Sequence, residues 1–105
     1  MNQEPRKIVE AIEEGKIVGY IVGGITKAEN YRKLPKTAEL ENMLVLKEYR
    51  NKGIGKALYE SFAKWCKEKK VKIERVLATA QNAKAIKFYK SHGFKEYSVI
   101  LERYK

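Results

Sequence analysis

The sequence has 105 residues and a formal charge of +10, because 23 Lys and Arg outnumber 13 Asp and Glu. This length predicts one small domain. The single Cys66 excludes an internal disulfide and favours a cytoplasmic location. The sequence also has no apolar run of membrane-spanning length and no secretory h-region, which favours the same location. The positive charge favours polyanionic ligands such as phosphorylated cofactors, nucleic acid or acidic peptides, without choosing among them.

The first half of the chain predicts three strands. Residues 7–13 and 16–26 are rich in β-branched and aromatic residues, and the Glu14-Gly15 turn between them predicts a hairpin. Residues 27–37 are polar, lack a clear period and predict a loop. Residues 38–46 predict the third strand. Strict alternation along it places four side chains on one face: Glu39, Glu41, Met43 and Val45.

The second half predicts a helix, a strand, a second helix and a last strand. The first helix, residues 54–69, has an apolar stripe made of Ile54, Leu58, Phe62, Trp65 and Cys66. Residues 73–80 predict a strand, and residues 82–92 predict a helix that stops at Gly93. Residues 94–104 predict the last strand. This order indicates an α/β fold of the α+β kind, a mixed sheet of about five strands with helices packed on it.

A glycine-bearing loop, Arg50-Asn51-Lys52-Gly53-Ile54-Gly55, joins the third strand to the first helix. Unpaired amides and the positive end of the helix dipole suit such a position to phosphate. A Walker loop is excluded, since Arg50 stands where its first Gly belongs and Ala57 follows the Gly-Lys pair. A dinucleotide fingerprint is excluded by Leu58 in place of its third Gly. A plain basic turn remains the alternative.

Two segments in the expected order resemble the GNAT superfamily of N-acetyltransferases. The first is Asn42-Met43-Leu44-Val45 followed, after four residues, by the loop, which is similar to the family's pattern of Arg or Gln, two residues, Gly, any residue, then Gly or Ala. The second consists of Asn82, Ala85, Phe88-Tyr89 and Gly93-Phe94. The resemblance covers about residues 7–104 and implies a single GNAT-like acetyl-CoA-binding domain over residues 1–105.

The resemblance assigns cofactor contacts to three places. The backbone of Arg50, Asn51, Lys52, Gly53, Ile54 and Gly55 would cradle the pyrophosphate of acetyl-CoA, and Lys56 would meet a phosphate. The main chain of Met43, Leu44 and Val45 would pair with pantetheine like another strand and polarise the thioester carbonyl. Asn82, with Ala85 and Phe88 on its helix, would hold the pantetheine arm. The simpler readings are sheet core for the strand and an N-cap for Asn82.

The resemblance also implies that Tyr89 protonates the departing thiolate, and a phenol with a pKa near 10 stays protonated for that task. Packing is the simpler reading. Glu39 or Glu41 is the candidate base, with Glu39 aligned to the glutamate of the family's histone-acetylating branch; a water relay is the alternative. His92 is read as a helix end and Cys66 as core rather than a nucleophile. Tyr20, Tyr31, Tyr97 and Tyr104 are candidates to line the acceptor site.

The favoured function is transfer of an acetyl group from acetyl-CoA to a primary amine of a small molecule or protein, directly within a ternary complex and without a metal. The alternative is a catalytically weak or inactive CoA-binding module with a regulatory or assembly role. Nucleic-acid binding is disfavoured because no basic and aromatic residues interleave. Family members usually begin with another strand and helices that wall the acceptor site, whereas this chain starts near their second strand. A homodimer that completes the acceptor site is therefore expected.

Overall fold

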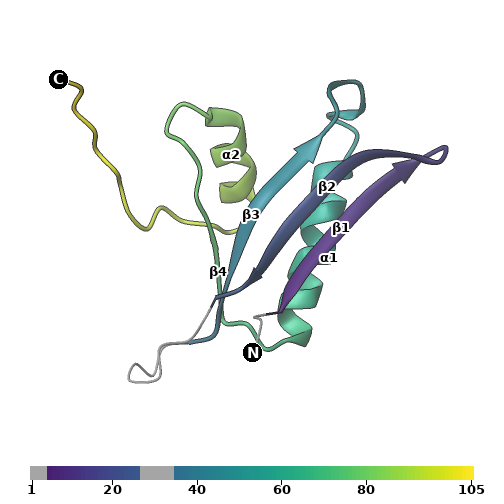
Figure 1. Cartoon of the computed structure of the whole chain (residues 1–105), viewed down its shortest axis with the longest axis horizontal. Helices are drawn as coiled ribbons and strands as arrows, with labels where there is room; N and C mark the ends of the chain where they lie inside the picture. The colour runs from purple at the N-terminus through teal and green to yellow at the C-terminus, as the bar shows by residue number, and fades with distance from the viewer. Residues whose placement is uncertain (1–4, 27–34) are drawn as a thin grey trace.

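The computed structural model describes residues 5–26 and 35–105, and these form a four-stranded sheet with two α-helices (Figure 1). In chain order the elements are β1 (Arg6–Glu13), β2 (Lys16–Ile25), β3 (Thr37–Val45), a 3₁₀ turn (Lys47–Tyr49), α1 (Ile54–Glu68), β4 (Ile73–Val76) and α2 (Ala83–Ser91). Residues 27–34 of the predicted loop, Tyr31 included, lie outside the described residues.

The sheet has the order β1-β2-β3-β4. β1 and β2 form the predicted hairpin, and positive φ angles at Glu14 (50°) and Gly15 (76°) give the two-residue turn that matches the twist of paired strands. β3 is antiparallel to β2, whereas β4 is parallel to β3 and reached through α1. The prediction of a mixed, partly parallel sheet is confirmed.

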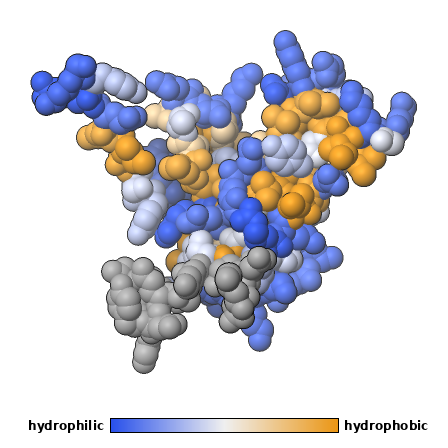
Figure 2. All heavy atoms as spheres, in the orientation of Figure 1, coloured by the Kyte–Doolittle hydropathy of each residue, from blue (hydrophilic) through white to orange (hydrophobic). Residues whose placement is uncertain are grey.

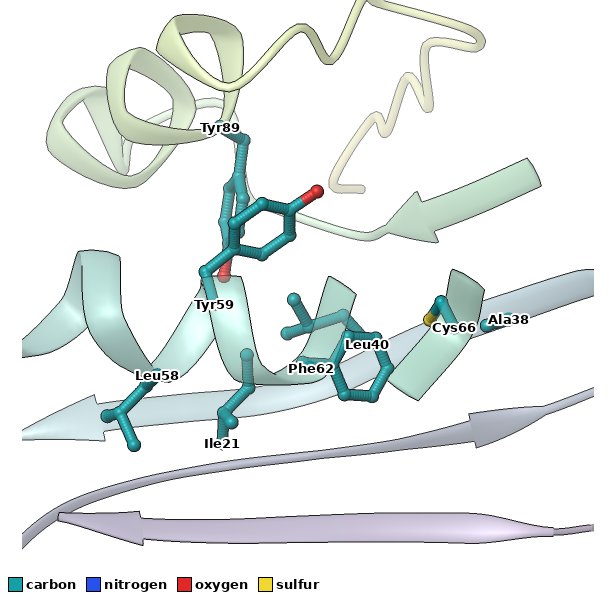
Figure 3. Close-up of a cluster of buried hydrophobic side chains, with 8 residues drawn as sticks. All are labelled: Ile21, Ala38, Leu40, Leu58, Tyr59, Phe62, Cys66 and Tyr89. Atoms are coloured by element: carbon teal, nitrogen blue, oxygen red, sulfur yellow. The ribbon is translucent and has the colours of Figure 1, made fainter. Parts of the chain in front are cut away.

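Helix α1 covers one face of the sheet and supplies half of the buried core cluster (Figure 3). The predicted stripe is confirmed, because Leu58, Phe62 and Cys66 are buried and Ile54 and Trp65 pack at its edges. Phe62 is fully buried, and its ring lies so close to Gly23 that a Cβ there would come within 2.6 Å of it. No helix among the described residues is long and apolar enough to cross a bilayer.

The face assignment along β3 is wrong in part. Leu40 pairs with Gly23 but Asn42 pairs with Val22, so Glu41 is an extra residue in a β-bulge. A bulge reverses the alternation that follows it. Before it, Glu39 points away from the buried side; after it, Met43 and Val45 pack toward α1. The two glutamates and the two apolar residues therefore occupy opposite faces.

The C-terminal prediction is also wrong: residues 94–105 form no strand in this structure, and the sheet has four strands rather than about five. The strand predicted over residues 73–80 is confirmed only for residues 73–76. A strand needs a partner edge as well as suitable residues, and the segment after α2 leaves the sheet instead of pairing with it (Figure 1). The helix predicted over residues 82–92 is confirmed as α2.

Candidate functional site

The parallel strands β3 and β4 separate part of the way along the sheet. Their pairing runs from Thr37↔Ile73 to Leu40↔Val76, where β4 ends, but β3 continues to Val45. β2 still pairs with the other side of β3 as far as Gly19↔Val45. The backbone of residues 41–45 is therefore left with a free edge on the β4 side, where an extended ligand can add as a strand.

The loop after β3 leads into a helix start that has unused donors. Gly53 is the N-cap of α1; its φ of 83° is the left-handed conformation that favours glycine, and no side chain caps the helix. Ala57 donates the first intrahelical bond, to the Gly53 carbonyl at 3.0 Å. The amides of Ile54, Gly55 and Lys56 precede that bond, and the first turn holds no acidic residue. This helix end therefore suits an anion.

Basic side chains gather beside the loop. The Nζ of Lys52 lies 5.5 Å from the centre of the Tyr49 ring, and the Nζ of Lys16, the first residue of β2, lies 6.0 Å from the same point. Arg50 donates from Nε to the Val45 carbonyl at 2.8 Å, so it also ties the loop to β3. The sequence did not single out Lys16, because the hairpin turn that brings it here is far away along the chain.

Gly55 brings the helix start close to the end of β3 and to α2. A Cβ at Gly55 would meet the Phe88 ring at 3.8 Å and the Met43 methyl group at 4.0 Å, which are ordinary contact distances. Three predicted cofactor-binding residues, Met43, Gly55 and Phe88, thus meet at one place. Leu44, by contrast, points to the opposite face, where it is exposed, so only its backbone belongs to the free edge.

Helix α2 carries the predicted acid and the predicted pantetheine contact. Asn82 is its N-cap, since its side chain accepts a bond from the Ala85 amide at 3.2 Å. Tyr89 is buried and points from α2 toward α1 (Figure 3), with its ring edge-on to Phe88 and Phe94. Burial raises the pKa of Tyr89 above that of a free phenol, so this hydroxyl holds its proton at neutral pH.

The two candidate bases lie on the open face of the sheet, away from the helices, and their surroundings differ. Glu41 forms an ion pair with Arg6 of β1, including a 2.7 Å bond from the guanidinium, and this hydrogen bond lowers the pKa of Glu41. A carboxylate held in this way is a weaker base. Glu39 is exposed beside the pairing of β3 with β4, where its register partner is Arg75. The geometry therefore favours Glu39 over Glu41.

Two residues near Tyr89 have structural partners. Tyr59 donates to the Glu74 carboxylate at 2.5 Å, and burial together with this bond raises the pKa of Tyr59 strongly. The sequence did not predict the burial of Tyr59, which lies beside the apolar stripe. His92 is the C-cap of α2, as expected, and its ring packs against that of Tyr59 at a tilt of 46°. Burial raises the pKa of the Cys66 thiol to about 12, which agrees with its interpretation as core.

Comparison with known proteins gives consistent matches. Residues 1–94 match the model of the Acetyltransferase (GNAT) family. An N-alpha-acetyltransferase of Sulfurisphaera tokodaii is 36% identical over 96 residues, which cover 87% of this chain and 58% of that protein. The chain thus spans less than two thirds of the length of this relative.

Solved structures of similar fold agree. A protein described as a "Putative acetyl transferase from Pyrococcus furiosus" superposes with a TM-score of 0.85 at 28% identity, over 98% of this chain and 68% of that one. An aminoglycoside acetyltransferase from an uncultured soil metagenomic sample superposes with a TM-score of 0.81 at 26% identity, over 99% and 68% of the two chains.

Proposed function

The chain belongs to the GNAT family of acetyltransferases, and from this we propose that it transfers the acetyl group of acetyl-CoA to a primary amine. The observation that carries the proposal is the free edge of β3 at residues 41–45, directly before a helix that starts with unused amides. The edge suits pantetheine and the helix start suits the pyrophosphate, so one extended ligand can use both. An assay that follows free CoA thiol with a panel of amines tests it.

In the proposed complex the pyrophosphate takes the amides of Asn51 to Gly55, and Lys16, Lys52 and Lys56 add positive charge. Pantetheine runs along Met43 to Val45, and a backbone amide of this stretch donates to the thioester carbonyl. Asn82, Ala85 and Phe88 border the arm from α2. The Arg50 side chain, which is bonded to Val45, holds the loop at the end of this path.

The proposed reaction uses both faces of the opening between β3 and β4. The amine attacks the thioester carbon from the open face, loses a proton to Glu39 or to a water that Glu39 orients, and forms the amide bond. The C–S bond breaks, and Tyr89 on the helix side gives its proton to the departing sulfur. A lysine-like amine with a pKa near 10.4 costs about 5 kcal/mol to deprotonate at neutral pH, so a nearby base matters.

The names of the relatives suggest two kinds of acceptor. One is described as an N-alpha-acetyltransferase and another as an aminoglycoside acetyltransferase. We propose that the acceptor is the primary amine of a protein N-terminus or of a small molecule, bound on the open face near Tyr20 and Asn42, whose side chains bond to each other at 2.9 Å. Peptides and amino sugars tested side by side with acetyl-CoA distinguish the two kinds.

Substitution of the two loop glycines separates cofactor binding from folding. Gly55→Ala should leave stability unchanged or raise it by up to about 1 kcal/mol, since alanine favours helix and its Cβ meets only ordinary contacts. The same Cβ should weaken CoA binding by at least tenfold in calorimetry if the pyrophosphate approaches the backbone here. Gly53→Ala in the same loop should by contrast lower stability by about 1 kcal/mol, because of the φ of 83°. Unchanged CoA affinity in Gly55→Ala contradicts the proposed cradle.

Substitution of the two glutamates tests the base. Glu39→Gln should lower kcat/KM at pH 7 by about 100-fold, at the low end for general-base catalysis. The deficit should shrink as the pH rises toward the pKa of the amine, because solvent then removes the proton. Glu41→Gln should change activity less than threefold, since Arg6 already weakens this carboxylate as a base. A larger loss in Glu41→Gln than in Glu39→Gln reverses the assignment.

A further inference from the structure

Five exposed lysines gather where α1 ends. All belong to the end of this helix or to residues bonded to it: Lys36, Lys67, Lys69, Lys70 and Lys72, referred to below as the lysine cluster. The Nζ of Lys36 donates to the Lys69 carbonyl at 2.7 Å, and the carbonyl of Lys36 accepts from the Lys72 amide at 2.8 Å. Figure 2 shows hydrophilic surface at the lower end of the molecule, where Figure 1 places the end of α1. The cluster concentrates positive charge at this end.

Little negative charge balances the lysine cluster. Along the chain from the first to the last lysine at the end of α1, Glu68 is the one acidic residue. Between described residues, ion pairs join Arg6 to Glu41 and Lys90 to Glu96, and neither pair includes a lysine of the cluster. Like charges that lie close together repel each other, so a polyanion bound here would relieve the repulsion.

The helix end that carries the cluster keeps a lysine in a left-handed conformation. The Val71 amide donates to the Cys66 carbonyl at 2.9 Å. The Lys70 amide donates to the Lys67 carbonyl at 3.0 Å. These two bonds define a Schellman motif, whose left-handed position is usually glycine. Lys70 occupies this position with a φ of 62°, which is unfavourable for a residue that has a Cβ.

Helix α2 ends in the same motif but uses glycine. The Gly93 amide donates to the Lys90 carbonyl and the Phe94 amide to the Tyr89 carbonyl, both at 3.1 Å, and Gly93 has a φ of 93°. A cation near the C-terminal end of a helix is favourable, but it gains less than the left-handed backbone costs. Residues held in unfavourable conformations cluster at functional positions. Lys70 therefore indicates a use for its charge beyond the stability of α1.

The chemistry of the cluster fits the phosphate backbone of a nucleic acid. Contacts from lysine to phosphates supply affinity that is independent of base sequence and needs no aromatic residue. Interfaces between proteins, by contrast, are depleted in lysine and anchored by buried aromatic and apolar residues. A helix that attaches to a membrane surface inserts its apolar face, and the apolar face of α1 is buried against the sheet.

We propose that the lysine cluster binds the phosphate backbone of a nucleic acid without reading its bases. The lack of interleaved basic and aromatic residues agrees with this mode, because that pattern serves the stacking of bases. The 15 residues of α1 separate the cluster from the loop before the helix by about 22 Å. The site is thus distinct from the proposed cofactor path, and the proposal does not depend on acetyl transfer.

Fluorescence anisotropy with a labelled single-stranded RNA of mixed sequence tests the binding over about 50–200 mM salt. Lys69→Gln combined with Lys72→Gln should weaken binding at least tenfold at about 100 mM salt. The slope of log K against log salt should fall in magnitude by about 1.4, since each lost phosphate contact removes about 0.7. A wild-type chain that does not bind the RNA overturns the proposal.

A matched pair of lysines controls for the charge of the whole surface. Lys84→Gln combined with Lys87→Gln removes the same charge from exposed positions on α2 and should weaken RNA binding less than about threefold. Lys52→Gln, in the loop before α1, should also leave RNA binding within about threefold. A loss as large as that of the cluster pair in either control overturns the proposal, because the RNA then binds elsewhere or without a defined site.

Lys70→Gly separates the use of this lysine from its cost. Glycine should raise the midpoint of thermal unfolding by about 4–8 °C, because it relieves the left-handed conformation. The same substitution should weaken RNA binding about fivefold at about 100 mM salt. Glu14→Gly, at a φ of 50° in the hairpin turn, is the matched control and should raise the midpoint without weakening RNA binding. A more stable Lys70→Gly chain with unchanged RNA affinity overturns the proposal.

Competing ligands distinguish the phosphate backbone from other partners. Single-stranded DNA of the same sequence should bind within about threefold of the RNA, since both present the same phosphates. Polyglutamate and phosphatidylserine vesicles, at equal concentration of charge, should compete with the RNA at least about tenfold less well than the DNA. Tighter binding of polyglutamate or of the vesicles than of the RNA overturns the proposal.

Discussion

Tyr89→Phe should reduce the turnover of acetyl-CoA by about 100-fold or more, while the affinity for CoA stays within about twofold. The substitution removes only the proton that the departing sulfur needs, and general-acid catalysis contributes at least this factor. Tyr89 is buried and burial raises its pKa above that of a free phenol, so the wild-type residue is protonated at neutral pH. Steady-state kinetics and calorimetry with CoA measure the two quantities.

Tyr59→Phe is the matched control, because it removes a second phenol from the same aromatic cluster (Figure 3). Tyr59 donates to Glu74, so its loss leaves a half-buried carboxylate without that donor and should cost about 1–3 kcal/mol of stability. Turnover should change little. If Tyr59→Phe slowed the reaction as much as Tyr89→Phe, the cluster as a whole would matter and the acid would not be assigned to Tyr89.

Phe62→Ala should lower the free energy of unfolding by about 3–5 kcal/mol, a large part of the 5–15 kcal/mol typical of a domain. Phe62 is the largest fully buried side chain, and it fills the space above Gly23 of β2 beside the ring of Trp65. Urea denaturation followed by Trp65 fluorescence measures the loss. A matched change at an exposed apolar site, Ile8→Ala, should cost less than about 1 kcal/mol. A cost below 1 kcal/mol for Phe62→Ala would contradict the core described here.

Most of the fold could be predicted because local signals and packing agree. The hairpin is marked by the Glu14-Gly15 turn, and the two helices are marked by the spacing of their apolar residues. Gly53 and Gly93, which both have positive φ, flank these helices. The segment after α2 could not be predicted in the same way. Its residues suit a strand, but whether they form one depends on an edge that the sequence does not reveal.

The position of the loop at the start of α1 could be predicted from the motif, whereas the binding role of the loop and of the β3 backbone stays a prediction. The side chains were predicted less well. The face of the sheet on which Met43 and Val45 lie was predicted wrongly, because a bulge leaves no trace in the periodicity of the strand. Two contacts join residues that are distant in sequence: Lys16 lies beside Tyr49, and Tyr59 donates to Glu74. No local sequence pattern predicts such contacts.

The extra residue at Glu41 limits how this protein can diverge. The side chains after the bulge alternate between the two faces of the sheet. Loss or gain of one residue at the bulge would therefore move each following side chain of β3 to the opposite face. Met43 would swing from the neighbourhood of Phe88 to solvent, and Leu44 would be driven into the interior. A single substitution in β3 therefore leaves the register unchanged, whereas a change of length is tolerated only beyond the ends of the strand.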